Sequence, residues 1–171
     1  NYNGYINDLP YQNYQFVTSC EKQIAHDIKE KLSYVAFDFD AEKQKANSSY
    51  ENYVAYILPD GRAITLNNEH FYCPELLFKP YLNGFDYDGI DKTLFDSIML
   101  CNENIRQDLC SNIVLAGGTT MIKGLSERIE KEITNLVPPN MRINIISHPD
   151  RINSSWIGAS IFASDALFPH K

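Results

Sequence analysis

Two glycines followed by two threonines could bind a phosphate or a nucleotide. Gly117-Gly118-Thr119-Thr120 follows an apolar run that predicts a buried strand and precedes a helical pattern. Glycines let a ligand approach the backbone, and amide groups at the start of a helix favour negative charge. A Gly-Gly pair after a strand is equally a steric solution to a tight turn, and the pair matches neither G-x-x-x-x-G-K-S/T nor G-x-G-x-x-G. The residues leave both interpretations open.

A second candidate lies on the first predicted helix, which we expect over residues 19–31. At about 100° per residue, Lys22, His26 and Lys29 share one narrow sector of this helix, with Glu30 beside it. A lysine ammonium could meet an anionic group, and a glutamate could accept hydrogen bonds from hydroxyls. A solvated helix face has the same pattern. The sector is therefore either part of a ligand site or a solvent-facing surface.

Hydrophobic periodicity and turn residues predict the elements of the first half of the chain, which position the second of these candidates. A capping box formed by Thr18 and Glu21 should begin the helix at 19–31. We expect a strand over 34–39, a charged loop over 40–49, and a hairpin over 53–66 that turns at Pro59-Asp60-Gly61. Asn68 is expected to cap a short helix with Pro74 in its first turn.

The second half of the chain alternates helices and strands. Helices are expected over 90–99, around 105–109, over 121–136 and over 153–167, and strands over 112–116 and 143–146. Such alternation is typical of α/β layers, whereas the earlier hairpin indicates an α+β lobe. We therefore predict an α/β chain with a small α+β lobe, residues 1–85, beside a mixed sheet flanked by helices, residues 86–171.

Composition excludes several classes of protein. The formal net charge is −7 and no Lys/Arg-rich run occurs, which argues against nucleic acid or anionic lipid as a partner. No apolar stretch approaches the roughly 18 residues that span a bilayer. The chain begins with neither Met nor a signal-peptide pattern, so we expect an excised piece of a longer protein.

Metal and disulfide chemistry are not expected. The four cysteines have irregular spacing, which favours reduced thiols in a reducing compartment; they are Cys20, Cys73, Cys101 and Cys110. The four histidines are scattered without the paired spacing of a structural zinc site. Acidic alternations at 38–42 and 86–88 lack the glycine that a calcium loop needs at its sixth position.

Five segments, in order, resemble the actin family. They are DIKEKLSYVAFD at 27–38, LPDG at 58–61, CPELLF at 73–78, VLAGGTTM at 114–121 and SWIGAS at 155–160. The resemblance extends from about Phe16 onward and implies the second half of an actin chain, with its fourth subdomain to about Phe85 and most of its third thereafter. It implies an actin-like ATPase fold of the ribonuclease H-like type.

The resemblance also implies a ligand. In this family ATP, with Mg²⁺ or Ca²⁺, lies in a cleft between two halves, and the half that is similar to this chain supplies adenine and ribose contacts. The matching positions are Lys29, Glu30, Gly117, Gly118, Thr119, Met121 and Ile122. The groups that grip phosphate, organise the metal and position the hydrolytic water belong to the other half. We therefore expect neither turnover nor tight nucleotide binding by this chain alone.

Three departures from the actin pattern concern this site. Ile122 stands where actins carry an aromatic residue, Ile152 where they carry a lysine, and His26 where they carry an arginine. Each change weakens the contacts to nucleotide, which favours an actin-related protein over a conventional actin. The loop at 79–90, at the place of the family's inter-subunit plug, is altered too and leaves filament formation open.

The resemblance leaves three functions open. The first is a component of cytoskeletal filaments in the cytoplasm, with other actin-like subunits, actin-binding proteins and the missing N-terminal half of the same chain as partners. The second is a non-polymerising scaffold subunit with a structural nucleotide, as in a chromatin-remodelling assembly in the nucleus or a dynactin-like assembly. The third is an enzyme of the wider sugar-kinase and chaperone ATPase superfamily.

Overall fold

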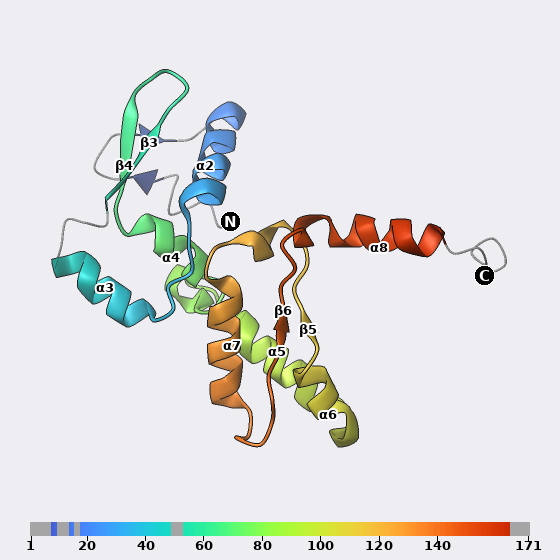
Figure 1. Cartoon of the computed structure of the whole chain (residues 1–171). Helices are drawn as coiled ribbons and strands as arrows, with labels where there is room; N and C mark the ends of the chain where they lie inside the picture. Colours follow the sequence, from blue (N-terminus) through green and yellow to red (C-terminus); the bar gives the residue numbers. More distant parts are fainter. Residues whose placement is uncertain (1–7, 10–13, 16–17, 49–52, 165–171) are drawn as a thin grey trace. The chain divides into compact units, whose positions relative to one another are not determined.

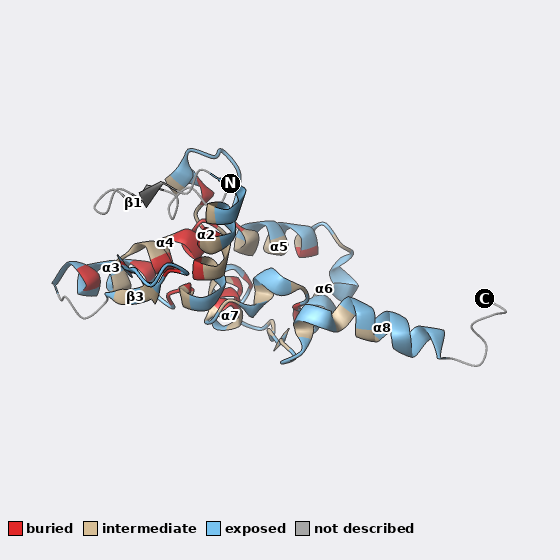
Figure 2. Cartoon of the chain, turned by 90° about the horizontal axis from the view of Figure 1, so that it is seen from above, coloured by how far each residue is buried: buried red, intermediate tan, exposed pale blue. Residues whose placement is uncertain are grey.

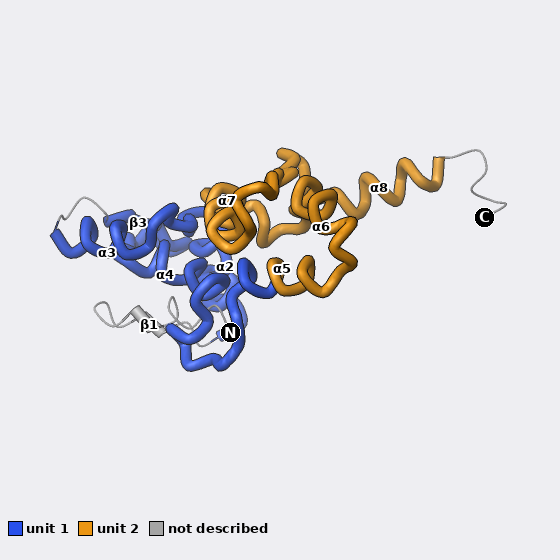
Figure 3. Tube along the Cα trace, turned by 90° about the horizontal axis from the view of Figure 1, so that it is seen from below, with its two compact units in different colours: residues 1–93 blue, residues 94–171 orange. Residues whose placement is uncertain are grey.

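The computed structural model describes residues 8–9, 14–15, 18–48 and 53–164. The chain divides into two units, residues 1–93 and 94–171, which Figure 3 colours separately. Helices and small two-stranded sheets make up the described chain, so its content is mixed α/β as predicted. The predicted lobe boundary at residue 85 stays a prediction.

The first described elements of unit 1 are a short antiparallel pair, β1 (Asp8–Leu9) and β2 (Tyr14–Gln15), followed by α2 (Ser19–Leu32). The predicted capping box is confirmed: the Glu21 amide donates to Thr18 Oγ1 over 3.3 Å, and the Thr18 amide donates to Glu21 Oε2 over 2.8 Å. The helix ends at Leu32, where the Ser33 amide bonds the Lys29 carbonyl. The predicted helix is confirmed to within one residue.

The predicted hairpin is also confirmed. β3 (Val54–Ile57) pairs antiparallel with β4 (Ala63–Leu66), and its turn closes through a 2.9 Å hydrogen bond from the Gly61 amide to the Leu58 carbonyl. Gly61 has φ +83°, a conformation that glycine adopts without strain. Figure 1 shows the hairpin of β3 and β4 beside α2. The two share a buried cluster, formed by Ala25, Ile28, Leu58, Ile64, Leu66 and Cys73. Burial of these apolar side chains fixes α2 against the hairpin.

The predicted strand over 34–39 and the predicted loop over 40–49 are wrong. Helix α3 spans Phe39–Ser48. Val35 and Ala36 are both buried, so the backbone there does not alternate its side chains as a strand would. Asp38 Oδ1 accepts the Ala41 amide over 3.0 Å, and this bond satisfies one of the free donors at the start of α3. The negative charges of the expected loop therefore lie in the first turns of a helix.

Helix α4 spans Glu69–Glu75, and Pro74 lies next to its last residue, so the predicted first-turn position is wrong. Proline has no amide hydrogen, which leaves the carbonyl four residues earlier without its helical donor. That carbonyl belongs to His70, and it accepts the amide of Tyr34 over 3.2 Å. Asn68 precedes the helix as predicted, but its side chain makes no capping hydrogen bond within the described chain.

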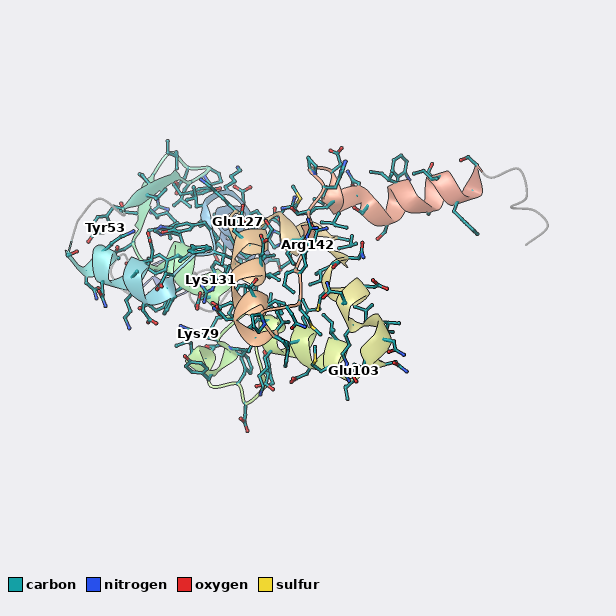
Figure 4. The ribbon with its side chains drawn as sticks, turned by 60° about the horizontal axis from the view of Figure 1, so that its bottom comes forward. Tyr53, Lys79, Glu103, Glu127, Lys131 and Arg142 are labelled. Carbon is teal, nitrogen blue, oxygen red and sulfur yellow. The ribbon has the colours of Figure 1, made fainter. Side chains whose placement is uncertain are left out.

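An ion cluster joins the end of α4 to the start of α3. Lys79, labelled in Figure 4, has Nζ 3.5 Å from Glu75 Oε1 and 3.8 Å from Asp40 Oδ2. The same ammonium lies 4.8 Å from the centre of the Phe39 ring. Glu75 is fully buried, so the Lys79 charge compensates a carboxylate that would otherwise be costly to bury. A short 3₁₀ helix, η2 (Pro80–Asn83), follows.

The boundary between the two units falls within helix α5 (Ile90–Met99). The helices that follow are α6 (Glu103–Cys110), α7 (Leu125–Leu136) and α8 (Ser154–Ala163), with the 3₁₀ helices η3 (Gly118–Met121) and η4 (Arg151–Asn153). The strands are β5 (Ile113–Val114), before η3, and β6 (Ile145–Ile146), after α7. β5 and β6 pair in parallel, and α7 connects them. The buried side chains of α7 include Leu125, Ile129 and Ile133.

The predicted helices and strands of unit 2 have the predicted types. Helix α5 also has the predicted bounds, whereas the others differ in theirs. Both strands are shorter than predicted, and α7 begins at Leu125 rather than Met121 because the intervening residues form η3 and then turn at Gly124, with φ +82°. α8 ends at Ala163; the last residues of the predicted helix lie outside the described residues. Among the described residues, no helix combines the length and the apolar character needed to cross a bilayer.

Candidate functional site

The glycine-rich turn leaves the sheet at the end of β5. The Leu115 amide makes the last bond to the neighbouring strand segment, 2.9 Å to the Ile146 carbonyl. Gly117 then adopts φ +87° and ψ 165°, a region open essentially to glycine alone. Thr120 closes the turn: its amide and its Oγ1 both donate to the Gly117 carbonyl, over 3.2 Å and 2.7 Å. The predicted turn is thus present, with a defined backbone conformation.

The outer side of this turn is open. The amides of Gly118 and Thr119 make no hydrogen bond within the part of the chain that the structure describes, and both residues are exposed. A Cβ built on Gly117 or Gly118 would meet no atom within 4 Å. Two adjacent free amides beside open space can donate to an oxygen of a ligand. The geometry therefore fits the ligand-binding interpretation as well as the steric one.

One arginine from a later segment bonds both ends of the turn. The Arg151 carbonyl accepts the Gly117 amide over 2.9 Å, and its guanidinium donates to the Thr120 carbonyl from Nη2 over 2.7 Å and from Nε over 3.1 Å. Nη1 donates to the His148 carbonyl over 3.1 Å. Arg151 could not be selected from the sequence, because the whole of α7 separates it from the turn and no local pattern links the two.

Other predicted site residues of unit 2 lie around this turn. Met121 ends η3 with 40% of its surface exposed, and Ile122 follows it, partly buried, with its amide bonded to the Thr119 carbonyl over 3.3 Å. Segments η3 and η4 contact each other, and Ile152 of η4 is exposed. The structure therefore brings the turn and the segment at 151–153 together within unit 2.

The predicted residues of unit 1 lie on α2. Glu30 Oε1 lies 3.5 Å from His26 Nδ1, one helical turn earlier; the Glu30 side chain is 63% exposed, whereas that of His26 is 42% exposed and its Nδ1 is buried. Lys29 is partly buried, and its ammonium makes no ion pair or hydrogen bond among the described residues. Burial raises the pKa of the Cys73 thiol, an effect that the positive charge of Lys29 opposes. Lys29 is therefore a cation available to an external anionic or acceptor group.

Metal chemistry has no site in this part of the molecule. Within residues 8–9, 14–15, 18–48 and 53–164, no three His, Cys, Asp or Glu side chains gather closely enough to hold a metal ion. The four cysteines are free thiols; Cys73 and Cys110 are buried, and burial raises the pKa of both. The described side chains thus offer cationic and hydrogen-bonding groups rather than metal ligands.

A comparison with family models agrees with the sequence. The model described as Actin matches residues 3–171 of the chain. The chain therefore belongs to the actin family, as its five ordered segments predicted. This match covers both units and both groups of candidate site residues.

Proposed function

We propose that this chain forms the nucleoside-binding side of an ATP cleft in an actin-like protein with a ribonuclease H-like ATPase fold. The observation that carries the proposal is the open turn after β5, in a member of the actin family, with the Gly118 and Thr119 amides free to donate. These amides, with Met121 and Ile122 beside them, would line the base or the approach to the phosphates.

The α2 residues support the same proposal from unit 1. Lys29 offers an ammonium that no carboxylate of the described residues bonds, and Glu30 offers an exposed carboxylate that can accept from ribose hydroxyls. His26 competes weakly for Glu30, because the Glu30 side chain is 63% exposed and solvent screens its charge. Among the described residues no three His, Cys, Asp or Glu side chains gather to hold a metal ion, so the Mg²⁺ or Ca²⁺ that accompanies ATP would need ligands from another half of the protein.

Apolar surfaces of unit 2 support such a second half. Val114 and Ile146 form a cross-strand pair, and they are 64% and 40% exposed, although parallel strands are usually covered on both faces. Helix α8 is apolar and has no buried residue, with Trp156 and Ile161 largely exposed (Figure 2). A helix without a polar face is normally buried. We propose that these surfaces pack against the N-terminal half of a longer actin-like chain.

The cellular role that we propose is a cytoskeletal filament component, with other actin-like subunits and actin-binding proteins as partners. The segment from η2 to Tyr87 supports an intermolecular contact, because Tyr81 of η2 is exposed and the rings of Phe85 and Tyr87, which follow η2, stack at 5.3 Å on the surface. A non-polymerising scaffold with a structural nucleotide is the alternative. Ile122 and Ile152 favour it, because neither apolar side chain replaces the aromatic stacking or the donor that tighter nucleotide binding would use.

An antibody raised against this chain tests the proposal. We expect it to detect, in extract of the source cells, a polypeptide of about twice 19.6 kDa. That polypeptide, purified, should bind Mg·ATP saturably, and Lys29→Ala should weaken binding whereas the matched control Lys45→Ala on α3 should not. A band near 19.6 kDa together with no ATP binding would refute the proposal. Sedimentation in magnesium and salt then separates the roles, since only a filament component should pellet.

A further inference from the structure

We propose that Arg151 is a positioning residue: it holds the turn at 117–121 in the conformation that keeps the Gly118 and Thr119 amides free for a ligand. The ligand part of this inference rests on the proposed function, whereas the structural part is independent of it. The inference adds a residue of η4 to the candidate site and assigns it a role in binding without contact to the nucleotide.

The hydrogen bonds of Arg151 fix the geometry of the turn. Arg151 bonds the Gly117 amide with its own carbonyl and the Thr120 carbonyl with its guanidinium, so one residue bonds both ends of the turn. Within the turn, the Thr120 amide and hydroxyl both donate to the Gly117 carbonyl, and a 3₁₀ hydrogen bond such as that of the amide is poorly aligned. The turn alone is therefore weakly determined, and the bonds from Arg151 select one conformation.

The guanidinium of Arg151 also sets the direction of the Thr120 carbonyl. Two guanidinium N–H groups occupy the Thr120 carbonyl, which can accept two hydrogen bonds. With this carbonyl held toward Arg151, its oxygen is not turned toward a bound phosphate or carbonyl, which it would repel. A positive charge at the carbonyl end of η3 also agrees with the local backbone dipole. The amides of Gly118 and Thr119, at the opposite end, remain available.

Arg151 is itself held in place by hydrogen bonds to His148. Its amide and its Nη1 both donate to the His148 carbonyl, each over 3.1 Å, and His148 Nδ1 accepts the Asp150 amide over 3.2 Å. The guanidinium is thus directed before any ligand arrives. A lysine could supply the charge but not the fork that reaches Thr120 and His148 together.

Hydrogen exchange on the full 171-residue chain tests the structural part. We expect Arg151→Gln to raise amide exchange at Gly117, Thr120 and Ile122 by about tenfold, as loss of a charged hydrogen bond should. Arg151→Lys should raise it nearly as much. The control is Arg142→Gln, an exposed arginine marked in Figure 4 whose backbone carbonyl accepts bonds from Gln107 and Ser111; it should leave exchange at the turn unchanged. Unchanged exchange in Arg151→Gln would overturn the inference.

Mg·ATP affinity of the polypeptide that the antibody detects tests the ligand part. We expect about a tenfold weaker affinity in Arg151→Gln and little rescue by Arg151→Lys, with the thermal unfolding midpoint of both variants within the range of the Arg142→Gln control. An affinity loss that follows a lowered midpoint, or full rescue by lysine, would overturn the positioning role. If the unmodified protein binds no ATP while exchange still rises in Arg151→Gln, the nucleotide assignment fails and the role of Arg151 in shaping the turn stands.

Discussion

The Tyr56 hydroxyl on β3 donates a 2.5 Å hydrogen bond to Asp27 Oδ2 on α2, and Lys31 Nζ lies 2.8 Å from the same oxygen. Tyr56 is one of the partly buried side chains that pack against the hydrophobic cluster between α2 and the hairpin. The hydrogen bond therefore lies beside that cluster. One carboxylate thus joins two elements that the sequence separates by α3.

Asp27→Asn should destabilise unit 1 at neutral pH. Hydrogen bonds from Lys31, and then from Tyr56, hold the pKa of Asp27 below the 3.8 of an unperturbed carboxyl. A lowered folded-state pKa gives stability that is complete above pH 3.8 and is lost as the pH falls through the folded value. Urea unfolding should show a gap between the two proteins that closes in acid, whereas Asp108→Asn, at an exposed position, should leave no gap.

His70 should make stability pH-dependent near neutrality. Its ring is buried beside Tyr34 and Phe71, and burial lowers its pKa from 6.5, opposed by the Asn67 backbone and nearby carboxylates. The unfolded chain then binds a proton more readily, so stability should fall as the pH drops through 6.5. Chemical denaturation should lose this step in His70→Gln and keep it in His148→Gln. An unaltered step in His70→Gln would contradict the assignment.

Gly89→Ala should destabilise the chain by about 1–3 kcal/mol, the usual cost of overpacking. An added Cβ would lie 2.1 Å from the Phe78 carbonyl oxygen, which is backbone and cannot rotate away. Gly158→Ala in α8 is the matched control: a Cβ there meets nothing within 4 Å, and alanine is the better helix former. In thermal melts the unfolding midpoint of Gly89→Ala should be lower than that of the parent protein, and the midpoint of Gly158→Ala should be higher.

Gly117→Ala should cost about 1–3 kcal/mol through backbone strain alone, since φ +87° with ψ 165° is open essentially to glycine. Gly118→Ala should cost less, because its φ is not positive and space around it is free. Equal losses in the two variants, measured by denaturant unfolding, would argue against the strained conformation at Gly117.

The fluorescence of Trp156 should show whether another part of the protein covers α8. It is the one tryptophan of the sequence and is 74% exposed. We expect iodide to quench its fluorescence readily in the 171-residue chain and poorly in the polypeptide that the antibody detects, where the proposed second half would bury it. Equally efficient quenching in both would count against that packing.

Local signals were enough to predict much of the fold. Thr18 and Glu21 satisfy backbone donors a few residues away, and Pro59-Asp60-Gly61 sets the dihedral angles of its own turn, so neither needs the rest of the molecule. Asp38 carried the start signal of α3, but an aromatic run around it resembled a strand. Pro74 could not be placed from sequence, since its position depends on the Tyr34 amide reaching the His70 carbonyl.

In the candidate site, too, the features set by local sequence could be predicted and those set by distant contacts could not. A strand followed by two glycines predicted the turn, because the requirement at Gly117 is a property of its own backbone. The bonds from Arg151 were beyond prediction, because they join distant segments through the pairing of β5 with β6. Whether Lys29 would be free or paired also depended on which carboxylates folding brings near it.

That parallel pairing sets an order of assembly. The hairpin β3–β4 joins neighbouring segments and can form early, whereas Ile113 reaches Ile145 only after α7 is in place between them. Arg151 lies later still, so a nascent chain that has emerged only through α7 already contains Gly117 and Thr120 but not the residue that bonds both. During synthesis the turn therefore cannot acquire these bonds before Arg151 has emerged, and a chain stalled earlier would present the turn without them.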